Sequence, residues 1–162
     1  MSEVREDIPH RHVTWADVHR DTKDLTRRLL GLGPWSGIVA LTRGGLVPAA
    51  IIARETGIRV VDTLCVASYD EQNQGTIQIL KTPAEAVAAE GNGWLLIDDL
   101  VDTGATAQAA RELLPAAHFA TVYAKPEGAK HVDTYVHDIA QEVWVFFPWD
   151  TEPRYVEPLA RG

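Results

Sequence analysis

The chain of 162 residues contains one cysteine and one methionine. The lone thiol, Cys65, lies in the apolar run from Val60 to Ala67, so no intramolecular disulfide is possible. Free cysteine is among the most buried residue types, and its scarcity fits a reducing compartment. We therefore expect a core thiol in a domain that is long enough to fold without disulfides or a structural metal.

Basic residues are also in short supply. The chain has 15 Lys and Arg residues against 23 Asp and Glu residues, which gives a formal net charge of -8. General nucleic-acid binding usually needs a basic surface that displaces counterions from phosphates. The composition therefore argues against a nucleic-acid partner, but it allows small phosphorylated ligands held by backbone amides and a divalent cation.

Long apolar runs are missing as well. No stretch approaches the ~20 apolar residues of a membrane-spanning helix. The first twelve residues are charged, lack a signal-peptide core, and include His10 and His12 without further metal ligands nearby. With 46% apolar residues, the chain is typical of soluble globular proteins, so we expect a cytoplasmic protein with a polar N-terminal tail.

Short apolar runs alternate with helical periodicity along the chain. Thr14 and Asp17 form a candidate capping box for a first helix whose exposed face carries mixed charges. Strands are expected over residues 37–41, 59–66, 76–81, 94–97 and 119–124, and helices over 15–30, 48–56, 82–90 and 107–114. This alternation predicts one α/β domain with a parallel sheet. From Glu127 onward the pattern is irregular.

One stretch combines an apolar strand, clustered acids and a small-residue loop. Residues 94–97 are uninterruptedly apolar, and Asp98, Asp99 and Asp102 follow without a basic residue among them. Such clustering is costly unless a cation or a hydroxyl-rich ligand is present. The small residues that follow precede a helix whose free N–H groups favour a phosphate: Thr103, Gly104, Ala105 and Thr106. An acidic turn that merely caps the helix is the alternative.

Two further segments carry candidate ligand groups. Arg43, between Thr42 and two glycines, offers a guanidinium fork and exposed N–H groups to a dianion, although a plain turn is an equal alternative. The aromatic run over residues 143–149 fits a core or a subunit interface, or a surface on which a flat heteroaromatic ligand stacks.

The segment LLIDDLVDTGATA resembles the 5-phosphoribosyl-1-pyrophosphate signature of type I phosphoribosyltransferases. The resemblance continues through LTRGGLVPAA, RVVDTLCVASYDEQNQ, AKPEG and VWVFFPWD, in the family's order, over residues 13–151. It implies an α/β fold with a central parallel sheet flanked by helices and a small C-terminal hood. Residues 1–162 would form one domain, with a core over 13–124 and a base-recognising hood over 125–151.

The resemblance also implies an activity in purine salvage. Such an enzyme transfers phosphoribosyl, with Mg²⁺, to N9 of a 6-oxopurine such as guanine, xanthine or hypoxanthine. Similar enzymes are homo-oligomers, dimers or tetramers, and some attach peripherally to the bacterial inner membrane. Two alternatives stay open: a regulator that senses the sugar phosphate without turnover, which usually carries a basic DNA-binding region, and a phosphoribosyltransferase for another base.

Residue roles follow from the matching motif positions. Asp98 and Asp99 would engage the ribose hydroxyls and the magnesium shell, with Asp99 as the metal residue. The 5'-phosphate would lie against Asp102, Thr103, Gly104, Ala105 and Thr106, and the pyrophosphate against Thr42, Arg43 and Gly44. Asp102 would also be catalytic, because in similar enzymes it sits near purine N7. Lys125 would donate to the 6-oxo group, Trp144 would stack on the base, and the Val145 backbone would lie near the 2-position.

The sequence departs from the family pattern in three places. Ala105 replaces the usual second glycine of the phosphate loop, which is tolerable if its backbone is not left-handed. Gly75 stands where an Arg is usual, and Phe146 with Phe147 replaces a polar pair beside the base. These departures leave the pyrophosphate contact and the ranking of the three bases open.

Overall fold

A computed structural model of the chain describes residues 8–69, 76–150 and 159–161. Gly75 lies outside the described residues. The helices are α1 (Trp15–Leu29), α2 (Leu46–Thr56), α3 (Ala84–Ala88), α4 (Ala105–Leu113) and α5 (Pro126–Ala129), with a 3-10 turn η1 (Leu159–Arg161). The strands are β1 (His10–His12), β2 (Gly37–Thr42), β3 (Val61–Tyr69), β4 (Thr76–Lys81), β5 (Trp94–Val101), β6 (His118–Ala124), β7 (Thr134–Asp138) and β8 (Trp144–Phe146).

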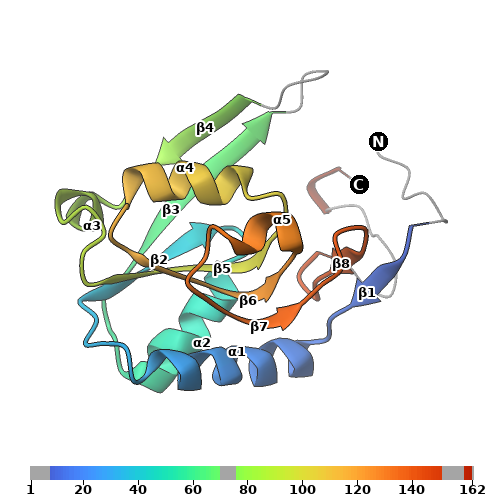
Figure 1. Cartoon of the computed structure of the whole chain (residues 1–162), viewed down its shortest axis with the longest axis horizontal. Helices are drawn as coiled ribbons and strands as arrows, with labels where there is room; N and C mark the ends of the chain where they lie inside the picture. Colours follow the sequence, from blue (N-terminus) through green and yellow to red (C-terminus); the bar gives the residue numbers. More distant parts are fainter. Residues whose placement is uncertain (1–7, 70–75, 151–158, 162) are drawn as a thin grey trace.

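Six strands form the main sheet in the order β4-β3-β2-β5-β6-β7. All neighbouring pairs are parallel except β3 and β4, which are antiparallel. Only residues 70–75 connect β3 to β4, and a parallel crossover needs about a dozen residues or more. Helices α1 and α2 cover one face of the sheet and α4 covers the other (Figure 1). The predicted α/β class with a parallel central sheet is confirmed.

The core is divided by the sheet into two layers of buried side chains. Along β5, Leu95 and Ile97 belong to the layer beneath α1 and α2, whereas Trp94 and Leu96 belong to the layer on the α4 side. All four are at most 5% exposed. Burial on both faces explains why this strand shows no polar alternation.

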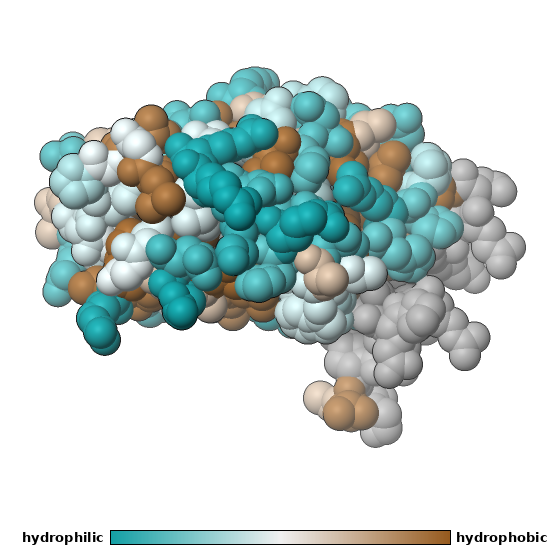
Figure 2. All heavy atoms as spheres, turned by 90° about the horizontal axis from the view of Figure 1, so that it is seen from below, coloured by the Kyte–Doolittle hydropathy of each residue, from teal (hydrophilic) through white to brown (hydrophobic). Residues whose placement is uncertain are grey.

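Helix α1 begins as predicted at a capping box. The side-chain oxygen of Thr14 accepts from Asp17 N at 3.1 Å, and Asp17 Oδ2 accepts from Thr14 N at 2.9 Å. The outer face carries acid–base pairs, including Arg20 with Asp17 at 3.0 Å. Hydrophilic side chains accordingly predominate where the molecule is seen from the side of α1 and α2 (Figure 2). The mixed charges fit a solvated face.

Several elements differ from expectation. His10–His12 form β1, which pairs in parallel with β8 beside the main sheet, so this part of the expected tail is ordered (Figure 1). Strand β5 continues to Val101, so Asp98 and Asp99 lie within it. The expected irregular region contains α5 and β7. Cys65 is half-buried, so the expectation of a packed core thiol is wrong.

The region over 125–151, expected to form the hood, is shared between two sheets. Strand β7 is an edge strand of the main sheet, whereas β8 pairs with β1. The division of the domain at residue 124 therefore stays a proposal. Among the described residues, no helix is long and apolar enough to cross a bilayer.

Candidate active site

The carboxyl ends of three adjacent parallel strands meet at one edge of the main sheet. Strand β2 ends at Thr42, β5 at Val101 and β6 at Ala124, and β5 is hydrogen-bonded to both neighbours. Ligands of open α/β sheets bind outside this edge, where the loops after the strands gather. The sequence-predicted residues after each strand are thereby brought together.

A cavity of about 470 Å³ lies at this edge. It joins Thr42, Arg43 and Gly44 after β2 to Asp98 and Asp99 at the end of β5. The peptide bond between Thr42 and Arg43 is cis. The cavity thus places a guanidinium and a glycine loop opposite two carboxyls, as binding of an anion together with a cation would require.

A smaller pocket of about 140 Å³ lies beside the first and is lined by the loop that starts α4. Asp98 and Thr106 line both cavities, and Asp102 lines the smaller one. Gly104 is the N-cap of α4, with φ 93°, a conformation that glycine adopts without steric cost. The first-turn N–H groups of a helix have no intrahelical acceptor, so this loop suits an anionic group.

The two strand ends approach each other closely at Gly44. A Cβ built on Gly44 would lie 2.5 Å from Cγ of Asp99, a separation that real Cβ atoms do not show. Glycine is therefore required wherever the Asp99 carboxyl keeps its position.

Burial and neighbouring negative charges disfavour the ionised forms of Asp98 and Asp99. Desolvation raises the pKa of Asp98 well above its usual value, and the neighbouring Asp99 charge raises it further. Desolvation also raises the pKa of Asp99 to about 6, and the charge of Asp150 adds to the shift. Hydrogen bonds from Asp99 N to Asp98 Oδ1 at 2.9 Å and from Leu100 N to Asp99 Oδ1 at 2.6 Å offset only part of this cost. A bound cation or a hydroxyl-rich ligand would relieve it.

The donor set at these acids fits magnesium. Within the described part of the chain, no three His, Cys, Asp or Glu side chains converge as a metal-ion cage. Mg²⁺ commonly takes one or two protein carboxylates and completes its shell with water and substrate phosphates. Asp98 and Asp99, beside a cavity with a candidate phosphate site, supply that kind of partial shell.

Asp102 is held by two donors from later segments of the chain. Lys125 Nζ lies 3.0 Å from Asp102 Oδ2, and Gln141 Nε2 donates to Asp102 Oδ1 at 2.9 Å. The Lys125 residue is only 4% exposed, and its backbone N–H donates to Val101 O at 2.9 Å. The carboxylate therefore links the loop after β5 to the end of β6 and to the turn before β8.

Trp144 and Val145 lie on β8. Trp144 is 54% exposed, whereas Val145 is 8% exposed and pairs with Arg11 of β1. Neither they nor Lys125 line the two described cavities. Asp102 is the residue that links the smaller cavity to Lys125. The structure thus groups the sugar-phosphate and pyrophosphate candidates around two adjoining cavities, with the base candidates outside them.

The sequence matches one family over most of its length. Residues 18–155 match the phosphoribosyl transferase domain. The xanthine-guanine phosphoribosyltransferase of Nitratidesulfovibrio vulgaris strain DP4 is 56% identical over 148 residues, which cover 91% of this chain and 88% of the relative. The chain belongs to the phosphoribosyltransferase family. The enzyme of the same name from Cereibacter sphaeroides is 49% identical over 162 residues, covering 96% and 97% of the two chains.

Solved structures support the fold of this phosphoribosyltransferase. A purine phosphoribosyltransferase from Pyrococcus horikoshii superposes with a TM-score of 0.71 at 24% identity, covering 93% of this chain and all of the other. The xanthine-guanine-hypoxanthine phosphoribosyltransferase of Helicobacter pylori gives a TM-score of 0.70 at 21% identity, covering 86% and 93%. The predicted type I phosphoribosyltransferase fold is confirmed.

Two departures from the family pattern gain a structural explanation. Ala105 is the first residue of α4 and has a helical backbone, so its methyl group is tolerated in the phosphate loop. Phe146 and Phe147 are 8% and 5% exposed. Their rings stack on His12 and Trp149, with centroids 4.9 and 4.8 Å apart. The aromatic pair therefore contributes mainly to packing around β8.

Sequence reasoning missed three residues at this site. Gln141 contacts Asp102, Asp150 lines the larger cavity, and the His131 ring packs where a Gly104 Cβ would lie, with Nε2 at 2.8 Å from that position. Asp150 directly follows the aromatic run, and this position was the only sequence feature that pointed to it. Gln141 and His131 lie in the region of irregular pattern, where nothing local marked them.

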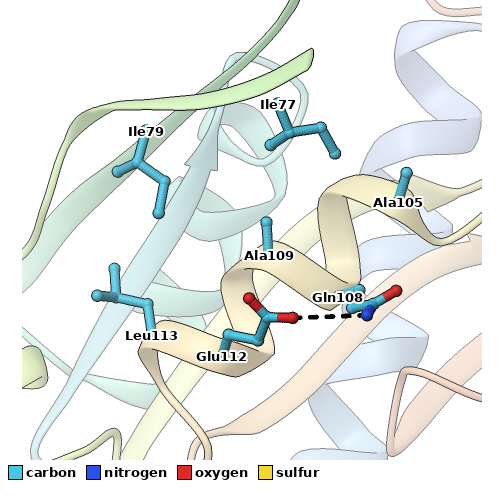
Figure 3. A pocket seen from close by; sticks show the side chains of 7 residues that line it. All are labelled: Ile77, Ile79, Ala105, Gln108, Ala109, Glu112 and Leu113. Atoms are coloured by element: carbon cyan, nitrogen blue, oxygen red, sulfur yellow. Dashed lines mark hydrogen bonds between the residues drawn. The ribbon is translucent and has the colours of Figure 1, made fainter. Parts of the chain in front are cut away.

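A third hollow, of about 500 Å³, lies between β4 and α4 (Figure 3). Ile77 and Ile79 face it from β4, and Ala109 and Leu113 from α4. Among the described residues that line it, Glu112 is the only acid, and its Oε1 accepts from Gln108 Nε2 at 3.5 Å. Its described lining is mainly apolar, unlike the lining of the cavity at the sheet edge.

Proposed function

We propose that this phosphoribosyltransferase transfers phosphoribosyl from 5-phosphoribosyl-1-pyrophosphate to N9 of a 6-oxopurine, with pyrophosphate as the other product. The observation that carries the proposal is the position of Asp102. Its carboxylate lines the pocket at the start of α4 and pairs with Lys125. A purine bound at this pair would have its N9 directed toward a ribose whose 5'-phosphate occupies the loop. The names of the curated relatives support guanine and xanthine as bases.

The sugar phosphate would be held across the two cavities. The amides and hydroxyls from Thr103 to Thr106 would bind the 5'-phosphate at the start of α4. Asp98 and Asp99 would bind the ribose hydroxyls, and Asp99 with the ligand's own phosphate oxygens would hold Mg²⁺. When bound, Mg²⁺ supplies charge neutralisation of the departing pyrophosphate. Thr42, Arg43 and Gly44 line the larger cavity, where their donors would receive the pyrophosphate.

The base would be selected by hydrogen bonding. Lys125 has three donors and no acceptor, so it favours a 6-oxo group and disfavours a 6-amino group. Asp102 Oδ2 would accept the N7 proton as N9 attacks the ribose carbon, and its negative charge would stabilise the positive charge developing on the purine and sugar. Trp144, 54% exposed on β8, offers a face on which the base stacks, and the Val145 backbone would lie near the 2-position.

The reaction can be tested with purified protein, saturating 5-phosphoribosyl-1-pyrophosphate and Mg²⁺, and guanine, xanthine, hypoxanthine, adenine or uracil in turn. The proposal predicts nucleotide formation with 6-oxopurines and little with adenine. Faster turnover with uracil or adenine would indicate a phosphoribosyltransferase for another base. Tight binding of the sugar phosphate without turnover would indicate a sensing protein. Chelation of Mg²⁺ with EDTA should abolish turnover, and added Mg²⁺ should restore it.

The oligomeric state and the cellular location of the protein are inferred from its resemblance to the family. We infer a homo-oligomer, a dimer or a tetramer, that works in the cytoplasm with at most peripheral contact with the inner membrane. Light scattering coupled to size-exclusion chromatography gives the mass of the assembly directly. A monomer at micromolar concentration would contradict the first inference, and recovery in the washed membrane fraction after high salt would contradict the second.

A further inference from the structure

Gln141 joins three segments that are distant in the sequence. It lies in the turn between β7 and β8. Its Nε2 donates to Asp102 Oδ1 at 2.9 Å, and its Oε1 accepts from the backbone N–H of Glu127 at 3.0 Å. The loop after β5, the first turn of α5 and the turn before β8 are therefore connected through one side-chain amide.

These contacts fix which way the amide of Gln141 faces. The backbone N–H of Glu127 can only donate, so the amide oxygen must point to it. The NH₂ group then points to Asp102, whose ionised carboxylate can only accept. A flipped amide would place donor against donor and acceptor against acceptor, so only one orientation satisfies both partners.

The carboxylate of Asp102 is thereby held at both oxygens. Oδ1 is bound by Gln141 and Oδ2 by Lys125, which fixes the plane of the group. An ionised carboxylate has about four acceptor positions, so two remain for a ligand after these two bonds. Without the Gln141 bond, the carboxylate would keep only its contact with Lys125 and could rotate, which would move the acceptor positions that face a ligand.

We propose that Gln141 is a positioning residue that orients the Asp102 carboxylate toward N7 of the purine. This inference rests on the proposed function. It assigns to Gln141 an effect on the chemical step, because a misplaced carboxylate costs most when the proton moves. The sugar-phosphate contacts of the loop use other atoms, so their strength should change little.

The test compares three variants with wild type in the guanine reaction. Gln141→Leu removes both hydrogen bonds at similar volume. Gln141→Glu keeps an oxygen for Glu127 N but replaces the donor that faces Asp102. Gln78→Leu makes the same polar-to-apolar change at an exposed position of β4 and serves as the control. For each protein, kcat, the KM for 5-phosphoribosyl-1-pyrophosphate and the melting temperature are measured, and the kcat values of Gln141→Glu and of wild type are followed from pH 5.5 to 9.

Gln141→Leu should lower kcat by about 10-fold or more, the loss expected for a hydrogen bond to a charged group, with KM for the sugar phosphate within about twofold of wild type. The ratio of Gln141→Glu to wild-type kcat should rise as pH falls, because protonation of the new carboxyl restores a donor to Asp102. Gln78→Leu should behave as wild type. A wild-type kcat in Gln141→Leu, or a pH-independent ratio for Gln141→Glu, overturns the proposal.

The same assay separates this inference from the proposed function. If the wild-type protein forms no nucleotide from any 6-oxopurine, the function itself is wrong. If wild type is active and the Gln141 variants match it, only the positioning role fails. Should Gln141→Leu melt below the assay temperature, the pH dependence of the Gln141→Glu ratio decides the question, since a purely structural role leaves that ratio flat.

Discussion

Lys125 Nζ lies 3.0 Å from Asp102 Oδ2, with the lysine side chain 5% exposed and the aspartate side chain 46% exposed. A buried ammonium needs a partner, whereas the half-exposed carboxylate keeps part of its hydration. The pair is therefore asymmetric. Its cation is fixed in the protein, and its anion is open on one side to a ligand.

Lys125→Met should lower the catalytic efficiency with the purine base. The substitution keeps the apolar stem but removes the donor to the 6-oxo group, so kcat/KM for guanine should fall by about 10–100-fold. The KM for 5-phosphoribosyl-1-pyrophosphate should change little. Steady-state kinetics with each substrate varied in turn measures both values. Lys130→Met, at an exposed position five residues later, is the matched control, and equal losses in the two variants would contradict the assignment.

Asp102→Asn should lower turnover far more than sugar-phosphate binding. The amide keeps the shape of the side chain but loses the charge that matters as the N7 proton moves, which predicts a loss of about 100-fold or more in kcat. 7-Deazaguanine, which has no N7, should be a poor substrate for wild type and should lose much less on the Asp102→Asn change than guanine does. An equal loss of kcat with the two bases would show that Asp102 does not act on the N7 proton.

Gly44→Ala should disrupt the larger cavity. Its Cβ would lie 2.5 Å from Cγ of Asp99, so either the carboxyl or the glycine loop must move. We expect kcat/KM for the sugar phosphate to fall by about 10-fold or more, because displacement of positioning groups is costly. Gly31→Ala is the control, since nothing lies within 4 Å of a Cβ there. Full activity in Gly44→Ala would show that Asp99 can move freely.

Asp99→Asn should stabilise the ligand-free protein at neutral and higher pH. Desolvation raises the pKa of Asp99 from 3.8 to about 6. A carboxyl whose pKa is higher in the folded state favours folding at low pH and loses that contribution as pH rises through about 4 to 7. The melting temperature of Asp99→Asn should exceed that of wild type by roughly 2–4 °C per kcal/mol recovered at pH 8, and the difference should shrink toward pH 4.

Differential scanning fluorimetry at several pH values without ligands measures this effect. Asp24→Asn, which removes a half-exposed charge that pairs with Arg27 on α1, is the control. A difference between Asp99→Asn and wild type that grows toward low pH would have the wrong sign and would contradict a raised pKa of Asp99 in the folded protein. Mg²⁺ with 5-phosphoribosyl-1-pyrophosphate should raise the melting temperature of wild type more than that of Asp99→Asn.

The sequence was most informative where local pattern and burial coincide. The uninterrupted apolar run before Asp98 predicted a doubly covered parallel strand, because β5 packs into both layers of the core. The capping box at Thr14 needs only neighbouring residues, and it was also predictable. Elements whose partners are distant were missed. His10–His12 become a strand only by pairing with β8, and no periodicity within three residues reveals that.

The site residues likewise fall into those that neighbouring residues predict and those that depend on distant parts of the chain. Residues carried by compact motifs, such as Arg43 and Asp99, were found from their neighbours in the sequence, and they line one cavity. Gln141 was not found, because its two partners lie 39 and 14 residues away. Its role depends on how the turn before β8 packs against the loop after β5, which is a property of the fold.

Transfer to a 6-oxopurine is tested most directly by measuring nucleoside monophosphate and pyrophosphate together in one reaction mixture with Mg²⁺ and 5-phosphoribosyl-1-pyrophosphate. With guanine we expect the two products in equal amounts, and without a base we expect neither. Pyrophosphate release that is independent of the base, or an equal rate with adenine, would contradict transfer to a 6-oxopurine recognised by Lys125 and Asp102.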